Sequence, residues 1–445
     1  MSKIEEYNKV ATAHFEEKKR YDLLKKRSKK DDDKIPYYKE QSNHHKKLFE
    51  KYDRLAFKEM LDRKVDIIKF YDEQVSRENT RALRSTRYYH YRLHKNVSVN
   101  EKERWAIDLI KLALTRSKSP ELSCSFGIDS IVVLYLTRKA LVELGRDPSD
   151  IQVVWCDTLN EFPEVRLFAK EMEKKWNLNL LIQKPKKPLK KIIKEHGGVD
   201  SSYFFTRKGD RTNGRPLSEK CCGTLKHEPM QRAIRENNWD LQINGVRADE
   251  STTRLRTCLR DGEYYYSSSE WKAFMCKPLS WWLEEDIWDY VEQENIPYAK
   301  MYENNLIQAY PHNLDEMIDL HIDKLKELNI DIEQFGNRQL ITTTRKQAIF
   351  IKKLGVKMFT PRVGCLACPI PVKYGYLHFI RTYYPKVYNT MIYNLGYGKA
   401  LLDMIPEETK EEIQFILGID LNEENAHEYL KDILNAKPCV FDKFN

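Results

Sequence analysis

The main constraint on the fold is an alternation that begins at Glu101, where short apolar runs are separated by longer amphipathic segments. The first run, Leu122–Phe126, precedes a helical pattern from Asp129 to Gly145. Parallel strands need long crossover connections, and a helix usually provides them, so this alternation predicts a parallel sheet. The further strands expected are Ile151–Cys156, Leu178–Ile182 and Leu241–Asn244, and the further helices are Pro163–Trp176, Leu189–Glu195, Glu228–Glu236 and Glu284–Glu294. We therefore predict an α/β fold with a Rossmann-like, doubly wound, mostly parallel sheet.

Regions with a different pattern flank these strands. Residues 1–100 contain no Gly and only one Pro, Pro36, which is typical of long polar helices. Residues 301–360 and the tail after Pro371 are also mainly helical in pattern. Four regions are expected: a basic helical N-terminal extension at 1–100, the α/β domain at 101–300, a helical insertion at 301–360, and a cysteine-pair segment with a helical tail at 361–445.

The net charge of +9 lies entirely in the N-terminal extension. Residues 1–100 hold 26 Lys and Arg against 17 Asp and Glu, whereas residues 101–445 hold 50 of each. A second local excess of +9 lies within residues 181–260. Positive regions attract anionic ligands, so we assign this second excess to a phosphate- or sulfate-bearing nucleotide, with a solvated surface as the alternative. A nucleic-acid partner, if there is one, is expected to bind through residues 1–100.

Thr80–Asn96 is the candidate nucleic-acid surface within the extension. It combines arginines with tyrosines, namely Arg81, Arg84, Arg87 and Arg92 with Tyr88, Tyr89 and Tyr91. Basic side chains pair with phosphates, and aromatic rings stack on bases. The favoured interpretation is a helix that docks on the main domain through its tyrosines, with its arginines in water, because no known nucleic-acid motif supports the alternative.

The composition predicts a cytoplasmic protein. Apolar residues make up 41% and charged residues 32% of the chain, as in globular proteins. The apolar run Ile131–Leu136 is far shorter than the roughly 20 residues that span a bilayer, and the first residues lack the apolar core of a secretion signal. We therefore expect no membrane partner. Nine cysteines in a reducing compartment favour metal, catalytic or buried thiols over disulfides.

The segment Ser123–Ser130, with the sequence SCSFGIDS, lies where a strand is expected to pass into a helix. A glycine permits a tight turn there, and serine hydroxyls and the free amides of the helix start can surround a phosphate. The segment is neither a GxxxxGK[ST] Walker A loop nor a GxGxxG turn. It is therefore a candidate phosphate- or sulfate-binding loop of another type.

Six segments, in order, resemble motifs of the phosphoadenosine phosphosulfate (PAPS) reductase family of the PP-loop ATP pyrophosphatases. Ser123–Ser130 is similar to the SGGxDS loop of that superfamily and still more to the SSFGI-type loop of the family. The other five are Val153–Val165 (VVWCDTLNEFPEV), Lys220–Pro229 (KCCGTLKHEP), Asn244–Arg254 (NGVRADESTTR), Lys277–Tyr298 (KPLSWWLEEDIWDYVEQENIPY) and Arg362–Pro369 (RVGCLACP). Together they lie within residues 120–300 and 361–370.

This resemblance implies an adenine nucleotide alpha hydrolase-like fold and an enzyme that binds an adenine nucleotide. The nucleotide or phosphate site would consist of Ser125, Phe126, Gly127, Ile128, Asp129, Ser130, Asp157, Thr158, Gly245, Arg247 and Arg254. Arginines clamp anionic oxygens through paired hydrogen bonds, although surface ion pairs are the alternative for both arginines. Glu250 is expected to orient an arginine. Asp129, Ser130 and Lys226 are the expected catalytic residues, whereas Trp281, Trp282 and Trp288 are expected in the core.

The expected metal ligands are Cys221, Cys222, Cys365 and Cys368, with 143 positions from Cys222 to Cys365. In cluster-bearing sulfonucleotide reductases and the DNA phosphorothioation sulfurtransferase, which the chain resembles, such cysteines hold a [4Fe-4S] cluster. Thiolates also bind zinc, so zinc and unliganded thiols stay open as alternatives. Lys220 and Lys226 would stabilise the thiolates and an anionic substrate. The other cysteines in or beside strands are expected to be packing residues, namely Cys124, Cys156, Cys258 and Cys276.

Two departures from the family pattern leave the reaction open. Reductases of the family usually carry a nucleophilic Cys in an E-C-G-L-H-type tail, whereas this chain ends in KPCVFDKFN. Cys439 is therefore either that nucleophile or an ordinary exposed thiol. The basic extension and the stretch Tyr302–Pro361 are also additional to the family pattern.

Three functions are compatible with these features. The favoured one is an iron–sulfur sulfurtransferase that uses ATP with Mg2+, adenylylates an acceptor such as a nucleic acid, and takes sulfur from a donor partner. The second is a sulfonucleotide reductase that acts on APS or PAPS and releases sulfite with electrons from a partner protein. The third is a non-catalytic nucleotide-binding adaptor in a larger complex.

Overall fold

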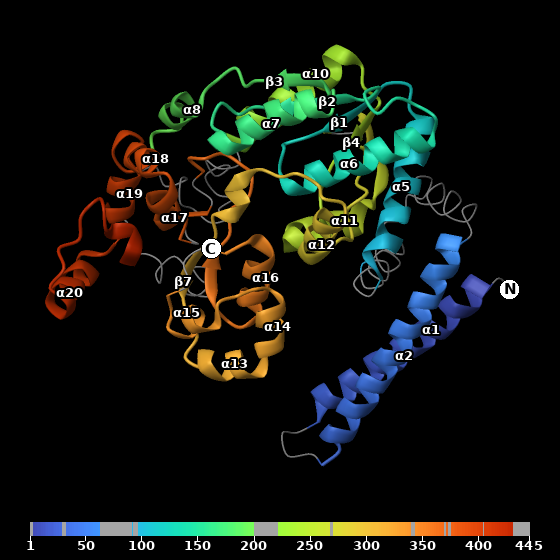
Figure 1. The fold of residues 1–445 in the computed structure, drawn as a ribbon. Coiled ribbons are helices and arrows are strands. Elements are labelled where there is room, and N and C mark those ends of the chain that lie inside the picture. Colours follow the sequence, from blue (N-terminus) through green and yellow to red (C-terminus); the bar gives the residue numbers. More distant parts are fainter. Residues whose placement is uncertain are drawn as a thin grey trace. The chain divides into compact units, whose positions relative to one another are not determined.

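The structure is a computed structural model (Figure 1). It describes residues 3–28, 33–62, 91, 97–199, 221–267, 270–339, 343–368, 371–372, 375–403 and 405–429. The chain forms two compact units. Unit 1 consists of Met1–Cys124, Asp129–Val153 and Asn238–Ile296, and unit 2 consists of Ser125–Ile128, Val154–Asn237 and Pro297–Asn445. No helix of the described ranges is both long and apolar enough to cross a membrane.

A mostly parallel, six-stranded sheet with the order β3-β2-β1-β4-β6-β5 confirms the expected α/β class. β1 is parallel to β4, β4 is parallel to β6, and β5 is antiparallel to β6. The order reverses at β1, and sheets of this kind bind ligands beyond the carboxyl ends of the strands at that point. The strands are β1 (Pro120–Ser123), β2 (Gln152–Cys156), β3 (Asn179–Gln183), β4 (Leu241–Ile243), β5 (Tyr264–Ser267) and β6 (Ala273–Cys276).

β1 ends at Ser123 rather than at Phe126, where the apolar pattern predicts its end. Phe126 has a φ of 57°, in the left-handed region, so it cannot extend a strand. Its buried ring instead meets the rings of Trp155 and Phe168 edge-on, at centroid distances of 5.4 and 6.4 Å. The Phe126 side chain therefore packs from the loop against Trp155 of β2 and against Phe168, and it does not extend β1.

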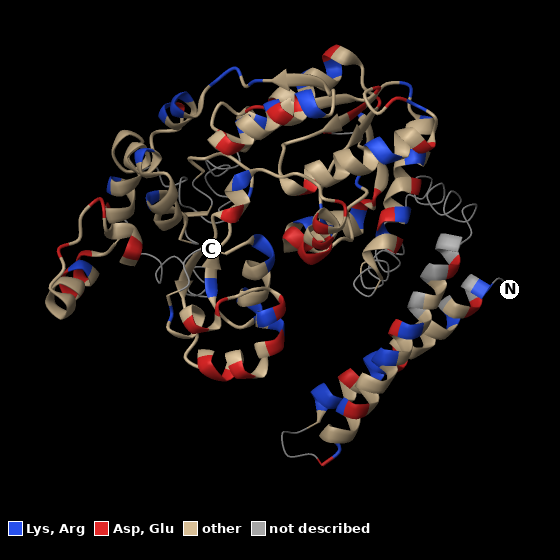
Figure 2. Cartoon of the chain, viewed as in Figure 1, with Lys and Arg blue, Asp and Glu red and all other residues tan. Residues whose placement is uncertain are grey.

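The N-terminal extension begins with a helical hairpin in unit 1. α1 (Lys3–Arg27) and α2 (Ile35–Asp62) run side by side, as Figure 1 shows, which confirms the long helices expected there. Ring contacts join the two helices, including Phe15 with Phe49 at 5.4 Å. Figure 2 shows basic and acidic residues mixed along both helices.

The other helices that the structure describes in unit 1 precede or follow the strands of the sheet along the chain. α5 begins with a capping box, in which Ser98 and Glu101 exchange hydrogen bonds. Trp281, Trp282 and Trp288 are 1%, 1% and 6% exposed, as expected of core residues. The bounds are α5 (Val99–Arg116), α6 (Ile128–Glu143), η2 (Ala248–Glu250), α11 (Thr252–Asp261) and α12 (Glu284–Gln293).

Unit 2 contains a strand pair that the sequence pattern did not reveal. β7 (Leu306–Ala309) and β8 (Lys357–Phe359) pair antiparallel within the stretch expected to be helical. Both strands are too short for a clear alternation of apolar and polar residues. The helices of unit 2 are α7 (Pro163–Lys175), α8 (Leu189–Glu195), η1 (Gly223–His227), α10 (Glu228–Asn237), η3 (Lys300–Glu303), α13 (Leu314–Leu320), α14 (Ile322–Glu327), α15 (Ile332–Gly336), α16 (Arg345–Lys353), α17 (Tyr376–Tyr383), α18 (Pro385–Asn389), η5 (Thr390–Asn394), α19 (Tyr397–Asp403) and α20 (Glu407–Leu417).

Candidate nucleotide-binding loop and cysteine site

The candidate phosphate loop follows β1 and ends in the first turn of α6. Gly127 N donates a hydrogen bond to Ser125 Oγ at 3.3 Å, and Ile128 N donates one to the Tyr302 hydroxyl at 2.9 Å. A Cβ atom at position 127 would lie 3.1 Å from Val363 Cβ and 3.3 Å from Tyr302 Oη. A side chain at this position would therefore crowd Val363 and Tyr302. The amides of Gly127 and Ile128 are both capped by hydroxyl oxygens.

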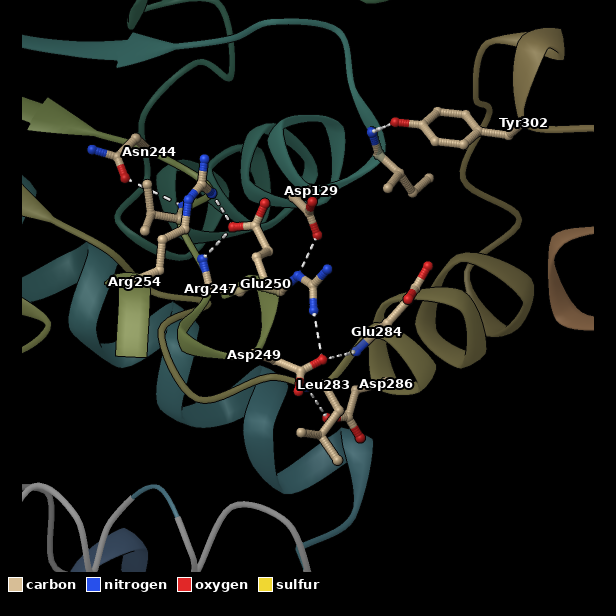
Figure 3. Close-up of polar contacts among 12 residues, drawn as sticks. Asp129, Asn244, Arg247, Asp249, Glu250, Arg254, Leu283, Glu284, Asp286 and Tyr302 are labelled. Carbon is tan, nitrogen blue, oxygen red and sulfur yellow. Dashed lines mark hydrogen bonds and ion pairs between the residues drawn. The ribbon is translucent and has the colours of Figure 1, made fainter. Parts of the chain in front are cut away.

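Asp129, in the first turn of α6, forms an ion pair with Arg247 in unit 1 (Figure 3). Arg247 Nε donates to Asp129 Oδ1 at 2.5 Å, and a second guanidinium nitrogen lies 3.4 Å from Asp249 Oδ2. Burial lowers the pKa of Arg247, but the charges of Asp129 and Glu250 outweigh burial and raise it. Arg247 therefore stays charged although its side chain is only 3% exposed.

Glu250 connects the two arginines of this loop. Its Oε2 atom accepts a hydrogen bond from Arg247 N at 3.1 Å and also pairs with the Arg254 guanidinium. The geometry agrees with the expected role of Glu250 in orienting an arginine. The Arg254 side chain is 45% exposed, so it is the more accessible of the two guanidinium groups. Anion binding by either arginine stays a prediction.

Gly245 brings the loop after β4 against the first turn of α6. A Cβ atom at this position would lie 2.9 Å from Asp129 C and O and 3.0 Å from Ser130 N. Real Cβ atoms do not approach backbone atoms so closely, so any side chain here would push the two segments apart. Ser130 is 7% exposed, and its buried position depends on this packing.

The same loop is fixed from the side of α12. Asp249 Oδ2 accepts a hydrogen bond from Glu284 N at 3.2 Å, which satisfies one of the free amides at the start of the helix (Figure 3). Asp286 accepts from Leu283 N at 2.6 Å and forms a short ion pair with buried Lys102. The arginine loop (residues 244–254) is therefore attached to the start of α12 through Asp249, and Asp286 in turn fixes the start of α12.

Asp157 and Thr158 follow β2 in unit 2, at the place where the family motif sets them. Asp157 Oδ1 accepts hydrogen bonds from Leu159 N and Arg166 NH2, each at 2.9 Å. Thr158 Oγ1 donates to Glu161 Oε1 at 2.7 Å. Asp157 and Thr158 are 7% and 0% exposed, so their polar groups are used to shape the turn. Contact with a nucleotide stays a prediction.

The four expected metal ligands gather in unit 2. Burial raises the pKa of Cys221, and the neighbouring Cys365, Cys222 and Cys368 raise it further. Burial also raises the pKa of Cys365, whose Sγ atom lies 3.5 Å from Thr158 Oγ1. Two sequence-distant cysteine pairs therefore share one electrostatic environment.

Lys226, in η1, is the cation of this environment. Burial lowers the pKa of Lys226, but Cys365, Glu161, Cys222 and Cys368 outweigh burial and raise it. A protonated lysine beside thiols favours their thiolate forms. The position agrees with the stabilising role expected for Lys226, and its catalytic role stays a prediction.

The thiols fit an iron–sulfur cluster by number and type. Within the described ranges, no three His, Cys, Asp or Glu side chains stand close enough together to hold a single metal ion. A [4Fe-4S] cluster is larger than one ion, so its ligands stand further apart. Four cysteine thiolates are the usual ligand set of such a cluster. Together these cysteines supply that set from two chain segments.

The structure adds Cys156 and Glu161 to the surroundings of this site. Cys156 was expected to be a packing residue, but its thiol donates to Leu225 O at 3.3 Å and interacts with Lys226 and Cys365. Burial raises the pKa of Cys156 to about 12 and also raises that of Glu161. Cys156 and Glu161 belong to the same family-like segment as Asp157. This shared segment was the feature of the sequence that could have indicated their place beside the site. The other three cysteines are buried as expected, namely Cys124, Cys258 and Cys276.

Some expected residues lie outside the described ranges. These are Lys220, Cys439, Arg81, Arg84, Arg87, Arg92, Tyr88 and Tyr89. Tyr91 is described, and its ring lies 6.1 Å from that of Trp281 in unit 1. For Tyr91 this contact agrees with the interpretation in which tyrosines dock the segment on the main domain.

The comparisons with known proteins agree with the motifs. A relative named phosphoadenosine 5'-phosphosulfate reductase, from Xylella fastidiosa, is 29% identical over 42% of this chain and 69% of its own length. One named sulfate adenylyltransferase subunit 2, from Methylorubrum extorquens, is 28% identical over 44% of this chain and 63% of its own. A solved PAPS reductase from Candida auris, in complex with phosphate, aligns with 19% identity and a TM-score of 0.34, over 51% of this chain and 90% of that one.

The family profile described as "Phosphoadenosine phosphosulfate reductase domain" matches residues 119–371, which is more than half of the chain. The match includes the phosphate loop, the arginine loop and both cysteine pairs. The chain therefore belongs to the phosphoadenosine phosphosulfate reductase domain family of enzymes.

Proposed function

We propose that this enzyme is an ATP-dependent sulfurtransferase that adenylylates its acceptor and holds a [4Fe-4S] cluster. The observation that carries the proposal is the grouping of Cys221, Cys222, Cys365 and Cys368 around Lys226. Buried thiols lose their protons readily only when a cation or a metal compensates the charge, so one lysine among four thiols favours a metal-bound state.

The first step would be adenylyl transfer. An acceptor oxygen attacks the α-phosphorus of ATP, the bond to the bridging oxygen breaks, and pyrophosphate leaves. Ser125–Ser130 would hold the phosphates through its amides and hydroxyls, with Mg2+ neutralising part of their charge. The relative named sulfate adenylyltransferase subunit 2 supports adenylyl transfer within the family and also favours a partner subunit.

The second step would be sulfur transfer. A sulfur nucleophile from a donor attacks the activated acceptor carbon, the carbon–oxygen bond breaks, and AMP leaves with the bonding electrons. Cys221, Cys222, Cys365 and Cys368 would hold the [4Fe-4S] cluster, and one of its irons could bind the transferred sulfur only in place of one of these four thiolates. Lys226 would balance negative charge beside these thiols, and Glu161 would hold the Thr158 turn next to Cys365.

A nucleic acid is the proposed acceptor, because the N-terminal extension carries the whole net positive charge of the chain. Removal of residues 1–96, which leaves α5 intact, should weaken nucleic-acid binding and flatten its salt dependence. Undiminished binding would contradict a role for the extension.

A sulfonucleotide reductase is the second candidate, favoured by relatives with the names PAPS reductase and APS reductase. In that reaction a thiolate attacks the sulfur of APS or PAPS, and the sulfur–oxygen bond to the nucleotide phosphate breaks. A second thiol then attacks the sulfur atom of the cysteine itself. The bond between this atom and the sulfonate sulfur breaks, sulfite leaves with the bonding electrons, and a disulfide forms that the electron donor reduces. Cys439 is the candidate nucleophile.

The two candidates are separated by their products. Anaerobic protein is incubated with ATP, or with APS or PAPS plus reduced thioredoxin, and pyrophosphate and sulfite are measured. We expect ATP-dependent pyrophosphate release that is lost in Ser130→Ala and kept in Ser149→Ala, a matched change in the connection between α6 and β2. Sulfite release that is lost in Cys439→Ser would instead establish the reductase. If neither product forms, the non-catalytic nucleotide-binding adaptor is the candidate that is left.

Metal analysis tests the cluster separately. Protein purified without oxygen should contain iron and acid-labile sulfide in equal amounts. Stoichiometric zinc in place of iron would contradict the cluster while leaving the nucleotide chemistry open.

A further inference from the structure

Tyr302 belongs to a stretch that the sequence motifs skip, yet its hydroxyl reaches the candidate phosphate loop. It accepts the hydrogen bond from Ile128 N at 2.9 Å, in a buried position (Figure 3). Ile128 is the first residue of α6, and amides at a helix start are the donors that usually bind phosphate oxygens. In the free protein this donor is already satisfied by Tyr302.

Arg345 holds Tyr302 in this position. The centre of the Arg345 guanidinium lies 5.3 Å from the centroid of the Tyr302 ring, in a cation–π contact. The two side chains are 2% and 3% exposed. Asn305 joins them, because its amide accepts from Arg345 NH1 at 3.2 Å and donates to Tyr302 O at 2.9 Å. Tyr302 and Arg345 therefore form one buried group.

The same arginine also contacts the segment that carries the second cysteine pair. Arg345 NH2 donates to Pro361 O, four positions before Cys365. Val363, in between, is the residue whose Cβ would meet a side chain at Gly127 at 3.1 Å. The phosphate loop and the segment 361–365 are thus connected within unit 2 both directly and through Tyr302 and Arg345.

We propose that the Tyr302 hydroxyl closes the phosphate loop in the free enzyme and that a phosphate oxygen displaces it on binding. The displacement shifts Arg345 and thereby the segment 361–365. Arg345 and Tyr302 are positioning residues in this scheme, and the cysteine pair responds to the occupancy of the loop. The inference rests on the proposed nucleotide site at Ser125–Ser130.

Calorimetric titration of the full-length enzyme with pyrophosphate and with ATP tests the closure. Tyr302→Phe keeps the ring on Arg345 but removes the oxygen that competes for Ile128 N. Since the variant leaves that buried amide unsatisfied only in the free state, it should bind pyrophosphate about tenfold more tightly than wild type. Equal or weaker binding would overturn the proposal, because the hydroxyl would then be neutral or part of the bound site.

Hydrogen–deuterium exchange tests the connection to the cysteine segment. In wild type, pyrophosphate should change the exchange of amides in residues 361–368. In Arg345→Lys, which retains the charge but not the planar two-sided contact, this change should disappear, while the pyrophosphate affinity stays within about threefold. A change of wild-type size in Arg345→Lys would overturn the connection. This measurement decides the proposal even if Tyr302→Phe fails to fold.

Tyr298→Phe is the matched control. Tyr298 contacts the Tyr302 ring, but its hydroxyl donates to Glu303 at 2.6 Å and not to the loop, so both readouts should match wild type. The failure of the two proposals is distinguishable. If wild type binds neither ATP nor pyrophosphate, the proposed function fails, whereas binding by wild type without a gain in Tyr302→Phe defeats the closure alone.

Discussion

The arginine loop and the cysteine site balance their charges in opposite ways. In the arginine loop, buried Arg247 faces the carboxylates of Asp129 and Asp249, so the charges are compensated within the protein. In the cysteine site, Lys226 faces Glu161 and several thiols. Burial raises the pKa of two of these thiols, Cys221 and Cys365. In the arginine loop, the charges balance without a ligand. In the cysteine site, the thiols become fully ionised only when further positive charge binds. Anion binding at the first site must therefore compete with existing ion pairs, and metal binding at the second must release protons.

The largest effect is expected at the cysteine site. Cys365→Ala should reduce the iron content per chain to less than about a tenth of the wild-type value, because a cluster with three thiolates loses much of its binding energy. Iron and sulfide analysis after anaerobic purification measures this loss. Cys258→Ala is the control, since Cys258 is a buried thiol of unit 1 and should leave the iron content unchanged. Retention of iron in Cys365→Ala would contradict the inference that the cysteine site, unlike the arginine loop, balances its charges by binding a metal.

The next effect concerns the arginine loop. Arg247→Met should lower the free energy of unfolding by about 2–3 kcal/mol, because it removes the charge-assisted hydrogen bonds of a buried guanidinium with Asp129 and Asp249. Arg254→Met, in the same loop, should change it by no more than about 1 kcal/mol, since that ion pair is partly exposed. Urea denaturation compares the variants. Similar losses in both would show that burial does not separate the two arginines.

A third prediction uses the buried carboxyl group of Glu121, which forms no ion pair with any residue that the structure describes. Burial raises the pKa of Glu121 on β1 from 4.5 to about 8, despite hydrogen bonds with Gln242 and Ser123. Because the folded state retains the proton, wild-type stability is lost as the pH rises from 4.5 to 8. Glu121→Gln has no titrating group at this position. The free energy of unfolding of the variant minus that of wild type should therefore increase by about 1.4 kcal/mol per pH unit across this window, and it should not increase further at higher pH.

Urea denaturation at pH 5, 6, 7, 8 and 9 measures this difference. Glu143→Gln, which makes the same chemical change at an exposed carboxylate at the end of α6, serves as the control. A flat difference for Glu121→Gln would mean that Glu121 ionises freely in the folded state.

The smallest effect compares glycines of the two sites. Gly245→Ala should cost about 1–3 kcal/mol, because its Cβ would lie 2.9 Å from the Asp129 backbone. Gly364→Ala, next to Cys365, should cost no more than about 0.5 kcal/mol, since a Cβ there meets nothing within 4 Å. Thermal unfolding distinguishes the two. Equal costs would contradict the tight packing inferred for the arginine loop.

Much of the fold was accessible from local patterns. Alternating apolar runs predicted the parallel strands and the helices between them, because side-chain periodicity reports directly on burial. The segment Ser123–Ser130 was located by its glycine and serines, although the strand before it ends earlier than the apolar pattern implied. Phe126 misled the prediction because a left-handed residue with a buried ring looks, in sequence, like a strand residue.

The surroundings of the site were less accessible. The family-like motifs identified both cysteine pairs and Lys226, but not the place of Cys156 and Glu161 beside them. Tyr302 and Arg345 gave no local signal, since neither belongs to a motif and both act through long-range packing. Similarly, the strands β7 and β8 are too short to produce a detectable alternation.

The sequence by itself determined the α/β class and the family, and it identified the four thiols that we propose as cluster ligands, because periodicity and motif spacing are local properties of the chain. Only the tertiary structure decided which charges meet. Asp129 and Arg247 are 118 positions apart, and Ile128 and Tyr302 are 174 positions apart. Such pairs follow from strand order and packing, so no local pattern encodes them. The alternation that begins at Glu101 predicts a sheet, and the sheet then determines the partners.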